Sequence, residues 1–303
     1  MAERWQRLLA AVDHWLARWR VTRVGRRALI GFGDHQAPQV AGSMAYFAML
    51  SLFQVVVLGI VAFSLIIGEG DARRVVIDRL EGALPVQPGT IAAVVDSIVQ
   101  ARGGITAVSV VILVWGGLGF FDALSVGVGR AFASPSRRPF WQDKLMVLLM
   151  MAAVVTLAMA ALVIGLIAGV AARLAEQLPG AAFDGRALLD LVALLLPTLL
   201  VLFALVVIYR LVPNRPIRLR QVWTGALVAT ALWTAIRLSF TWYATSIAHY
   251  QSFFGPVSTA ITLLVFLYLS SASVLLGAEV ARASIAEDEE IAAGHAGQRT
   301  PVV

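Results

Sequence analysis

Six long runs of apolar residues constrain this chain more than any other feature of its sequence. They cover residues 40–68, 105–125, 145–172, 188–211, 222–248 and 256–280. At about 1.5 Å per helical residue, each run is long enough to cross about 30 Å of hydrocarbon. Because lipid offers no hydrogen bonds, a spanning segment of this kind must be an α-helix, which satisfies its own backbone. The sequence therefore predicts an all-α integral membrane protein built on a bundle of six transmembrane helices.

The overall composition points to the same class. Hydrophobic residues make up 59% of the 303 residues, charged residues make up 14%, and the mean hydropathy is +0.83. Soluble domains contain about a quarter charged residues. A chain of this size with so few charges cannot cover a soluble surface, so the composition excludes an ordinary soluble protein.

The positive charges lie between the apolar runs and are unevenly distributed. Of the arginine and lysine residues, 17 lie in the two terminal segments and the even-numbered connections, and 6 lie in the odd-numbered connections. Short loops rich in these residues stay on the cytoplasmic side. The bias predicts a bacterial inner-membrane protein with both termini in the cytoplasm. Because the basic residues do not gather on one soluble face, the net charge of +6 predicts topology and no nucleic acid partner.

This pattern divides the chain into three segments. Residues 1–39 form a cytoplasmic or interfacial segment, residues 40–281 form the six-helix domain, and residues 282–303 form a polar tail that we expect to be disordered. The first connection is long, and residues 69–104 are expected to form two short amphipathic helices outside the membrane.

The N-terminal segment combines tryptophan and arginine at helical spacing. Its apolar positions recur at i, i+3, i+4 and i+7, as on one side of an amphipathic helix. A helix with aromatic residues on one side and cations on the other suits the lipid interface, close to anionic headgroups. The interface anchors expected from this pattern are Trp5, Trp15, Trp19, Arg4, Arg7 and Arg18. The alternative is a soluble helix that packs on the cytoplasmic side of the bundle.

The sequence contains no recognisable catalytic motif. There is no cysteine, the four histidines lie far apart, and neither H-E-x-x-H nor G-x-S-x-G occurs. No phosphate-binding or dinucleotide-binding glycine motif is present despite 25 glycines. The sequence therefore predicts a protein that is not an enzyme and that binds no metal or cofactor.

Ionisable and amide side chains inside the apolar runs are the candidate functional residues, because such groups are costly in hydrocarbon and usually face a bundle interior or a hydrated cavity. They are Arg237 in the fifth run, Asp122 at the end of the apolar core of the second, Glu279 near the inner end of the sixth, and Gln54 in the first. Arg237 is suited to bind an anionic headgroup, and the two acids are suited to gate a path or to couple protons. The alternatives are structural, namely a snorkelling arginine and acids that cap helix ends.

The second run is rich in glycine, with Gly116, Gly117 and Gly119 following Trp115. Glycine at this density either lets helices approach closely or permits a break in the helix. We expect the second helix to become irregular after Gly119.

Three ordered motifs resemble those of the YihY/virulence factor BrkB family of membrane proteins. Residues 41–53 (AGSMAYFAMLSLF) are similar to the first-span motif of that family. Two later motifs of that family also have counterparts in this chain. The second is matched by residues 209–215 (YRLVPNR) with Trp223, Gly225 and Ala226, and the third by Tyr250, residues 254–256 (FGP) and residues 276–279 (LGAE). The chain departs from the pattern at Gln54, where the family usually has proline.

The resemblance implies a six-helix inner-membrane protein. It places Tyr46, Ser51 and Glu279 inside family motifs. It also implies a connection with serum resistance and with the movement of lipid or lipopolysaccharide precursors, and some members were formerly named ribonuclease BN.

These observations favour a transporter or flippase-like protein for an anionic lipid or another amphiphile, with no ATPase of its own. The residues expected to line its path or to gate it are Arg237, Gln54, Asp122, Glu279, Tyr46 and Ser51. The expected partners are anionic membrane lipids, and a second copy of the chain or an envelope protein is a further candidate. The alternative is a structural or envelope-assembly factor of the membrane, and a ribonuclease ranks last.

Overall fold

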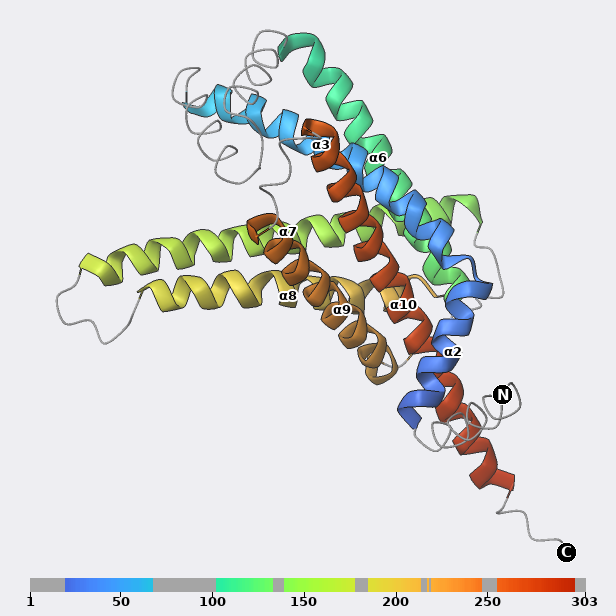
Figure 1. The fold of residues 1–303 in the computed structure, drawn as a ribbon. Coiled ribbons are helices and arrows are strands. Elements are labelled where there is room, and N and C mark those ends of the chain that lie inside the picture. The colour runs from blue at the N-terminus through green and yellow to red at the C-terminus, as the bar shows by residue number, and fades with distance from the viewer. Residues whose placement is uncertain are drawn as a thin grey trace, which may run out of the picture. The chain divides into compact units, whose positions relative to one another are not determined.

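Figure 1 shows the protein as a computed structural model in which every described element is an α-helix. The structure describes residues 20–67, 102–132, 139–177, 185–213, 217, 219–246 and 255–297. In chain order the helices are α2 (Arg20–Asp34), α3 (Ala37–Ile67), α6 (Arg102–Ala131), α7 (Phe140–Gln177), α8 (Gly185–Leu211), α9 (Leu219–Ser246) and α10 (Gly255–Gly297). The predicted all-α class is therefore confirmed for the described part of the chain.

Four of these helices are long and apolar enough to cross a membrane. The stretches that qualify by length and composition are Ala107–Ala131, Trp141–Ala171, Leu219–Tyr243 and Ala260–Ala293. They correspond to the second, third, fifth and sixth predicted runs. The first and fourth runs lie in α3 and α8, and α8 contains a shorter apolar stretch, Leu195–Leu211. Within the described residues the structure thus supports a membrane protein with four candidate spans.

The chain divides into two compact units. The first unit comprises the described residues within 1–38, 125–232 and 272–303, and the second comprises those within 39–124 and 233–271. The boundaries cut through α6, α9 and α10 and near the start of α3, so each of these four helices contributes to both units.

The first unit packs around the α8–α10 contact. Tyr209 is fully buried, and its hydroxyl donates a hydrogen bond to the carbonyl oxygen of Val274. The ring of Phe132 lies 6.4 Å from the Tyr209 ring. The backbones of α9 and α10 meet at Gly225 and Gly277, where a Cβ on Gly277 would lie 2.7 Å from the Gly225 carbonyl oxygen. Small residues at this crossing permit the close approach of helices that is common in membranes. In the same unit, α7 and α8 lie side by side (Figure 1).

The second unit includes the contact between α3 and α6. A Cβ on Gly119 would lie 2.5 Å from the Phe47 ring, and one on Gly116 would lie 2.7 Å from the Ser51 hydroxyl oxygen. The rings of Phe47 and Trp115 meet edge to face at 5.8 Å. The helix α6 continues without interruption from Arg102 to Ala131, so the expected irregularity after Gly119 is wrong. These glycines make room for Phe47 and Ser51 of α3. They serve the close packing of two helices and do not break α6.

The C-terminal segment also differs from expectation. We expected disorder from Arg282 onward, but α10 continues to Gly297. Alanine and glutamate are good helix formers, and three of the four acidic residues in this stretch, Glu287, Asp288 and Glu290, are paired with arginines of α2. The predicted interfacial helix within residues 1–19, the two short helices expected within residues 69–104, and residues 298–303 of the tail lie mostly or wholly outside the described residues.

Candidate functional site

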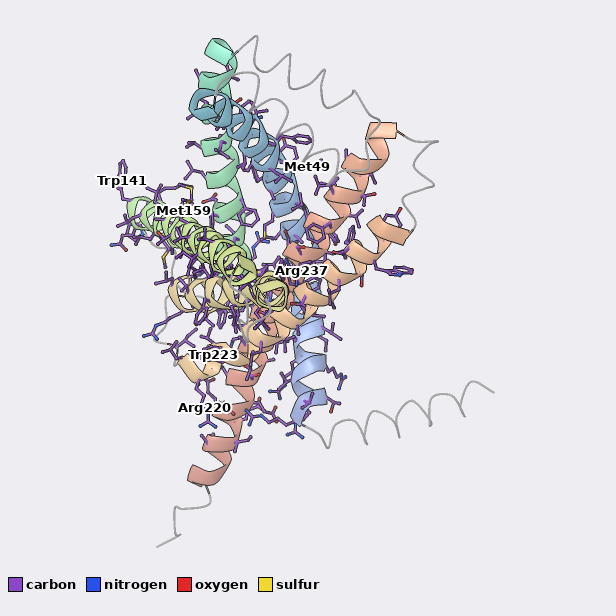
Figure 2. The ribbon with its side chains drawn as sticks, turned by 90° about the vertical axis from the view of Figure 1, so that its left-hand side faces the viewer. Met49, Trp141, Met159, Arg220, Trp223 and Arg237 are labelled. Atoms are coloured by element: carbon purple, nitrogen blue, oxygen red, sulfur yellow. The ribbon has the colours of Figure 1, made fainter. Side chains whose placement is uncertain are left out.

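Arg237 places a cation inside the apolar stretch of α9, in the second unit. Its guanidinium carbon Cζ lies 5.4 Å from the ring centroid of Trp233, one helical turn earlier. This distance is typical of a cation–π interaction. The Arg237 Nε is buried and has no hydrogen-bond partner among the described residues. Figure 2 labels Arg237 together with Arg220, which lies 17 residues earlier, near the start of the same helix.

Two threonines lie on the same side of α9 as Arg237. Thr234 precedes it by three residues and Thr241 follows it by four, and residues at these spacings are neighbours on a helix surface. The Thr241 hydroxyl donates a hydrogen bond to the carbonyl oxygen of Arg237 at 2.9 Å. The Thr234 hydroxyl is buried and makes no hydrogen bond to any described residue. In the second unit, this side of α9 therefore holds two buried polar groups, on adjacent turns, that make no hydrogen bond to a described residue, and Thr230, one turn earlier in the first unit, has a hydroxyl in the same state.

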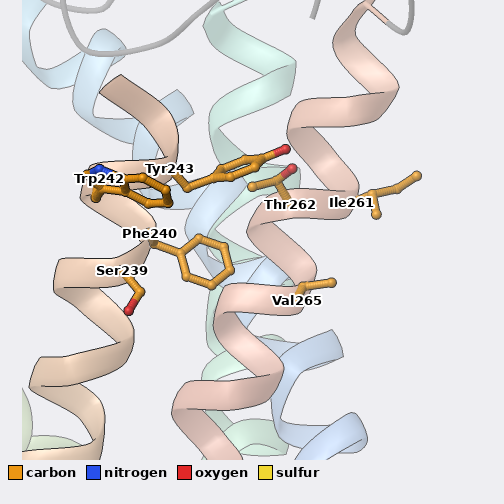
Figure 3. A pocket seen from close by; sticks show the side chains of 7 residues that line it. All are labelled: Ser239, Phe240, Trp242, Tyr243, Ile261, Thr262 and Val265. Carbon is orange, nitrogen blue, oxygen red and sulfur yellow. The ribbon is translucent and has the colours of Figure 1, made fainter. Parts of the chain in front are cut away.

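A groove of about 470 Å³ lies between the end of α9 and the start of α10, also in the second unit. Figure 3 shows the rings of Phe240 and Tyr243 extending from α9 toward α10. The Phe240 ring meets the Phe266 ring at 5.2 Å. The residues that line the groove are Ser239, Phe240, Trp242, Tyr243, Ile261, Thr262 and Val265. At 100° per residue, Phe240 is the groove residue of α9 nearest to Arg237, and the other groove residues of α9 lie further round the helix, so the groove and the Arg237 side of α9 are separate faces.

Glu279, in the first unit, has a partner that the sequence does not indicate. Its side chain is 4% exposed, and its Oε1 lies 2.7 Å from Nδ1 of His35, at the corner between α2 and α3. Gly31 makes room for the carboxylate, because a Cβ there would lie 2.5 Å from Oε2 of Glu279. The corner itself is formed by Gln36, a non-glycine residue with a positive φ of 56°. Such a conformation ends α2 and turns the chain into α3.

A row of ion pairs joins α2 to the last turns of α10. Both Nε and Nη2 of Arg23 donate to Oε1 of Glu287, at 2.8 and 2.6 Å. Arg27 Nη2 donates to Glu290 at 2.9 Å and lies near Glu287, and this hydrogen bond raises the pKa of Arg27 above its usual value. Arg20 pairs with Asp288. We call these contacts the α2–α10 ion-pair cluster, and the Glu287 side chain at its centre is only 5% exposed.

The structure scatters the other predicted site residues. Tyr46 is 53% exposed on α3. The Ser51 hydroxyl packs against Gly116, and Gln54 and Asp122 are half-buried. These four share the second unit with Arg237, whereas Glu279 belongs to the first. The anchors expected at positions 4, 5, 7, 15, 18 and 19 lie outside the described residues.

Sequence reasoning missed His35, Gly31, Trp233 and Thr234 as members of these sites. His35 and Glu279 are 244 residues apart, and no local pattern connects them. Trp233 and Thr234 could have been found from their helical spacing to Arg237. Among the described residues, no group of three or more histidine, aspartate and glutamate side chains is arranged to hold a metal ion.

Comparison with known proteins assigns most of the chain to one family. The family model described as virulence factor BrkB matches residues 28–301. A UPF0761 membrane protein of Rhodospirillum rubrum is 31% identical over 258 residues, which cover 84% of this chain and 56% of that protein. The chain thus spans little more than half the length of this relative.

Two further relatives match over most of their length. The ribonuclease-like protein YfkH of Bacillus subtilis is 23% identical over 81% of this chain and 89% of its own length. A UPF0761 membrane protein of Aggregatibacter aphrophilus is 25% identical over 82% of this chain and 87% of its own. No solved structure shows a significant match. The candidate spans and the family match together show that this chain is a membrane protein of the virulence factor BrkB family.

Proposed function

We propose that this protein is a transporter or flippase-like protein that moves an anionic lipid, or another anionic amphiphile, across the bacterial inner membrane without an ATPase of its own. The observation on which the proposal rests is Arg237, a cation within an apolar stretch of α9 whose Nε has no hydrogen-bond partner among the described residues. The partner that we propose is a membrane lipid with a negatively charged headgroup. We propose no catalytic role for the protein.

A charged side chain is costly inside a membrane-spanning helix. Arg237 lies about 9 Å along the helix axis from Tyr243 and about 27 Å from Leu219, the two ends of the apolar stretch. An arginine at the centre of a membrane helix costs about 2.5–3.5 kcal/mol on insertion scales, and this value is an upper bound for Arg237, which lies nearer one end. The cation–π interaction with the Trp233 ring offsets about 0.5–2 kcal/mol of this insertion cost. A phosphate oxygen at the guanidinium would supply charge-assisted hydrogen bonds, which are among the strong ones in proteins.

The membrane arrangement that we propose has six spans, with α3 and α8 added to the four candidate spans. The 31 residues of α3 contain no charged side chain, which supports a span there. In this arrangement residues 1–39 and 282–303 lie in the cytoplasm and residues 40–281 form the transmembrane domain. Fusions of a reporter enzyme after each connection would test the order of inside and outside loops.

The function is tested with purified protein in liposomes of phosphatidylcholine that contain a trace of fluorescent phosphatidylglycerol. We expect the protein to accelerate exchange of the labelled lipid between leaflets, measured by quenching from outside. Arg237→Gln should slow this exchange by at least about tenfold, because a hydrogen bond to a charged group is worth about 1.5–3 kcal/mol. Arg220→Gln makes the same change near the start of α9 and is the matched control. Exchange equal to protein-free vesicles, or an equal effect of both substitutions, would reject the proposal.

A second candidate function is an envelope-assembly factor that does not transport. Exposed apolar side chains on α2, outside the candidate spans, favour it: Val21 is 80% exposed and Leu29 is 64% exposed. In this case the partner is an envelope protein or a second copy of the chain. Complementation by a chain with Arg237, Gln54 and Glu279 all replaced would favour assembly over transport. The name of the Bacillus relative raises ribonuclease activity as a third candidate, and purified protein that cleaves no RNA would dismiss it.

A further inference from the structure

We propose that the side of α9 formed by Thr234, Arg237 and Thr241 is a water-accessible path for a phosphate-type anion, with Thr234 as a second ligand-contact residue. The role of this path in transport rests on the proposed function, but the path itself can be detected without measuring lipid movement. All three residues belong to the second unit and to one continuous helix.

Two buried polar groups on this side of α9 make no hydrogen bond to a described residue. The large majority of buried polar side-chain atoms in proteins have a hydrogen-bond partner, and an unsatisfied one costs about 1–3 kcal/mol. The Thr234 hydroxyl oxygen and Arg237 Nε are both buried, and neither is bonded to a described residue. A helix that only packed against its neighbours would gain stability from valine at position 234. Two such groups on adjacent turns of one face indicate a site that a polar ligand or water completes.

An aromatic ring holds the Arg237 guanidinium. The Trp233 ring, one turn before Arg237, lies 5.4 Å from the guanidinium carbon and supports one face of the cation. A tryptophan in this position stabilises the charge without neutralising it, since the ring carries no formal charge. The positive charge is therefore kept available, and an anion is the ligand that it favours. Thr241, whose hydroxyl is bonded to the Arg237 carbonyl oxygen, extends the polar face toward the end of α9.

The ligand chemistry follows from these groups. The hydroxyl of Thr234 can donate one hydrogen bond and Arg237 several, and all of them suit oxygen acceptors with negative charge. A phosphate group offers such oxygens, either in a lipid headgroup or as free phosphate. Ala235 follows Thr234 but, at 100° per residue, lies on another side of the helix, and it is apolar and exposed.

The test uses the absence of cysteine from the natural chain, which lets single cysteines serve as unique labels. Thr234→Cys and Thr241→Cys report on the path, and Ala235→Cys is the matched control at the same depth on another side of the helix. Each variant in phosphatidylcholine vesicles is treated from the water with an anionic or a cationic methanethiosulfonate, neither of which crosses lipid. We expect both threonine positions to react and position 235 to remain unmodified.

The charge of Arg237 provides the decisive comparison. At Thr234→Cys the anionic reagent should react about tenfold faster than the cationic one, and the added substitution Arg237→Gln should abolish this preference. No reaction at position 234, or the same preference with and without Arg237, would overturn the proposal. Labelling at position 234 without lipid exchange would support the path and reject transport. Lipid exchange without labelling would support transport and reject the path.

Two further arms identify the source of the anion. Slower anionic labelling when phosphatidylglycerol is added to the vesicles would assign the site to a lipid headgroup. Slowing by inorganic phosphate in the bath would assign it to soluble phosphate. Equal rates in all three conditions would overturn the anion site.

Discussion

The His35 ring nitrogen Nδ1 lies 2.7 Å from the Glu279 carboxylate oxygen Oε1, and this contact joins α2 to α10 across 244 residues of sequence. Glu279 is buried, whereas the His35 side chain is 37% exposed. A buried carboxylate needs a hydrogen-bond partner, because its desolvation is otherwise uncompensated. His35 therefore stabilises the docking of α2 on α10 by giving this buried carboxylate a hydrogen-bonding partner from outside α10.

Removing the histidine should destabilise the protein more than removing the charge of its partner. We expect His35→Ala to lower the free energy of unfolding by about 1–3 kcal/mol, because it leaves a buried carboxylate without this partner. Glu279→Gln keeps a hydrogen-bonding oxygen and should cost less. Glu289→Gln makes the same chemical change at an exposed position of α10 and serves as the control. Thermal unfolding in one detergent compares the variants, and an effect of His35→Ala no larger than that of the control would contradict the role of the pair.

A methyl group at Gly31 should act through the same carboxylate. A Cβ there would lie 2.5 Å from Oε2 of Glu279, whose other oxygen is held by His35, so Gly31→Ala should destabilise the protein. In a Glu279→Ala background the obstacle is gone, and the same change should stabilise by up to about 1 kcal/mol through helix propensity. Gly33→Ala, with open space around its Cβ, is the control in α2. The same sign of effect in both backgrounds would show that Gly31 does not make room for Glu279.

The α2–α10 ion-pair cluster should depend on the arrangement of its charges. Glu287 is 5% exposed and accepts two hydrogen bonds from Arg23. Arg23→Glu should release α2 from α10, because it places two carboxylates side by side. The double variant Arg23→Glu with Glu287→Arg exchanges the two charges and should restore part of the contact. Limited proteolysis between α2 and α3 measures release. Exposed ion pairs are worth only about 0–1 kcal/mol and are screened by salt, so Arg20→Ala should have little effect. Failure of the charge exchange to restore protection would mean that packing alone holds α2.

The sequence predicted the helices well because apolar run length is a local property. It also identified Arg237, since a charge inside an apolar run needs no structural knowledge to recognise. It did not find His35 as the partner of Glu279, because the two are joined only by the docking of α2 on α10. A histidine in a basic N-terminal segment has no local feature that distinguishes it.

The two wrong expectations have the same origin. The charged composition after Arg282 predicts disorder, yet Glu287, Asp288 and Glu290 pair with arginines of α2. The glycines after Trp115 looked like a break because Phe47 and Ser51, which fill the space beside them, come from α3. In both cases the stabilising group lies on another helix, and sequence pattern gives no information on which helices meet.

The glycines where α9 meets α10 give the most demanding test of the packing. A Cβ on Gly225 would overlap the carbonyl oxygen of Gly277, and a Cβ on Gly277 would lie 2.7 Å from the carbonyl oxygen of Gly225. Since both obstacles are backbone atoms, the helices must separate, and Tyr209 would lose its close fit beside Gly277. We expect either glycine-to-alanine change to lower the free energy of unfolding by about 1–3 kcal/mol, because the steric cost exceeds the gain in helix propensity from alanine. Gly169→Ala on α7, where the Cβ meets open space, should not destabilise. Melting temperatures in one detergent compare the three variants, and equal values would show that α9 and α10 do not meet at these residues.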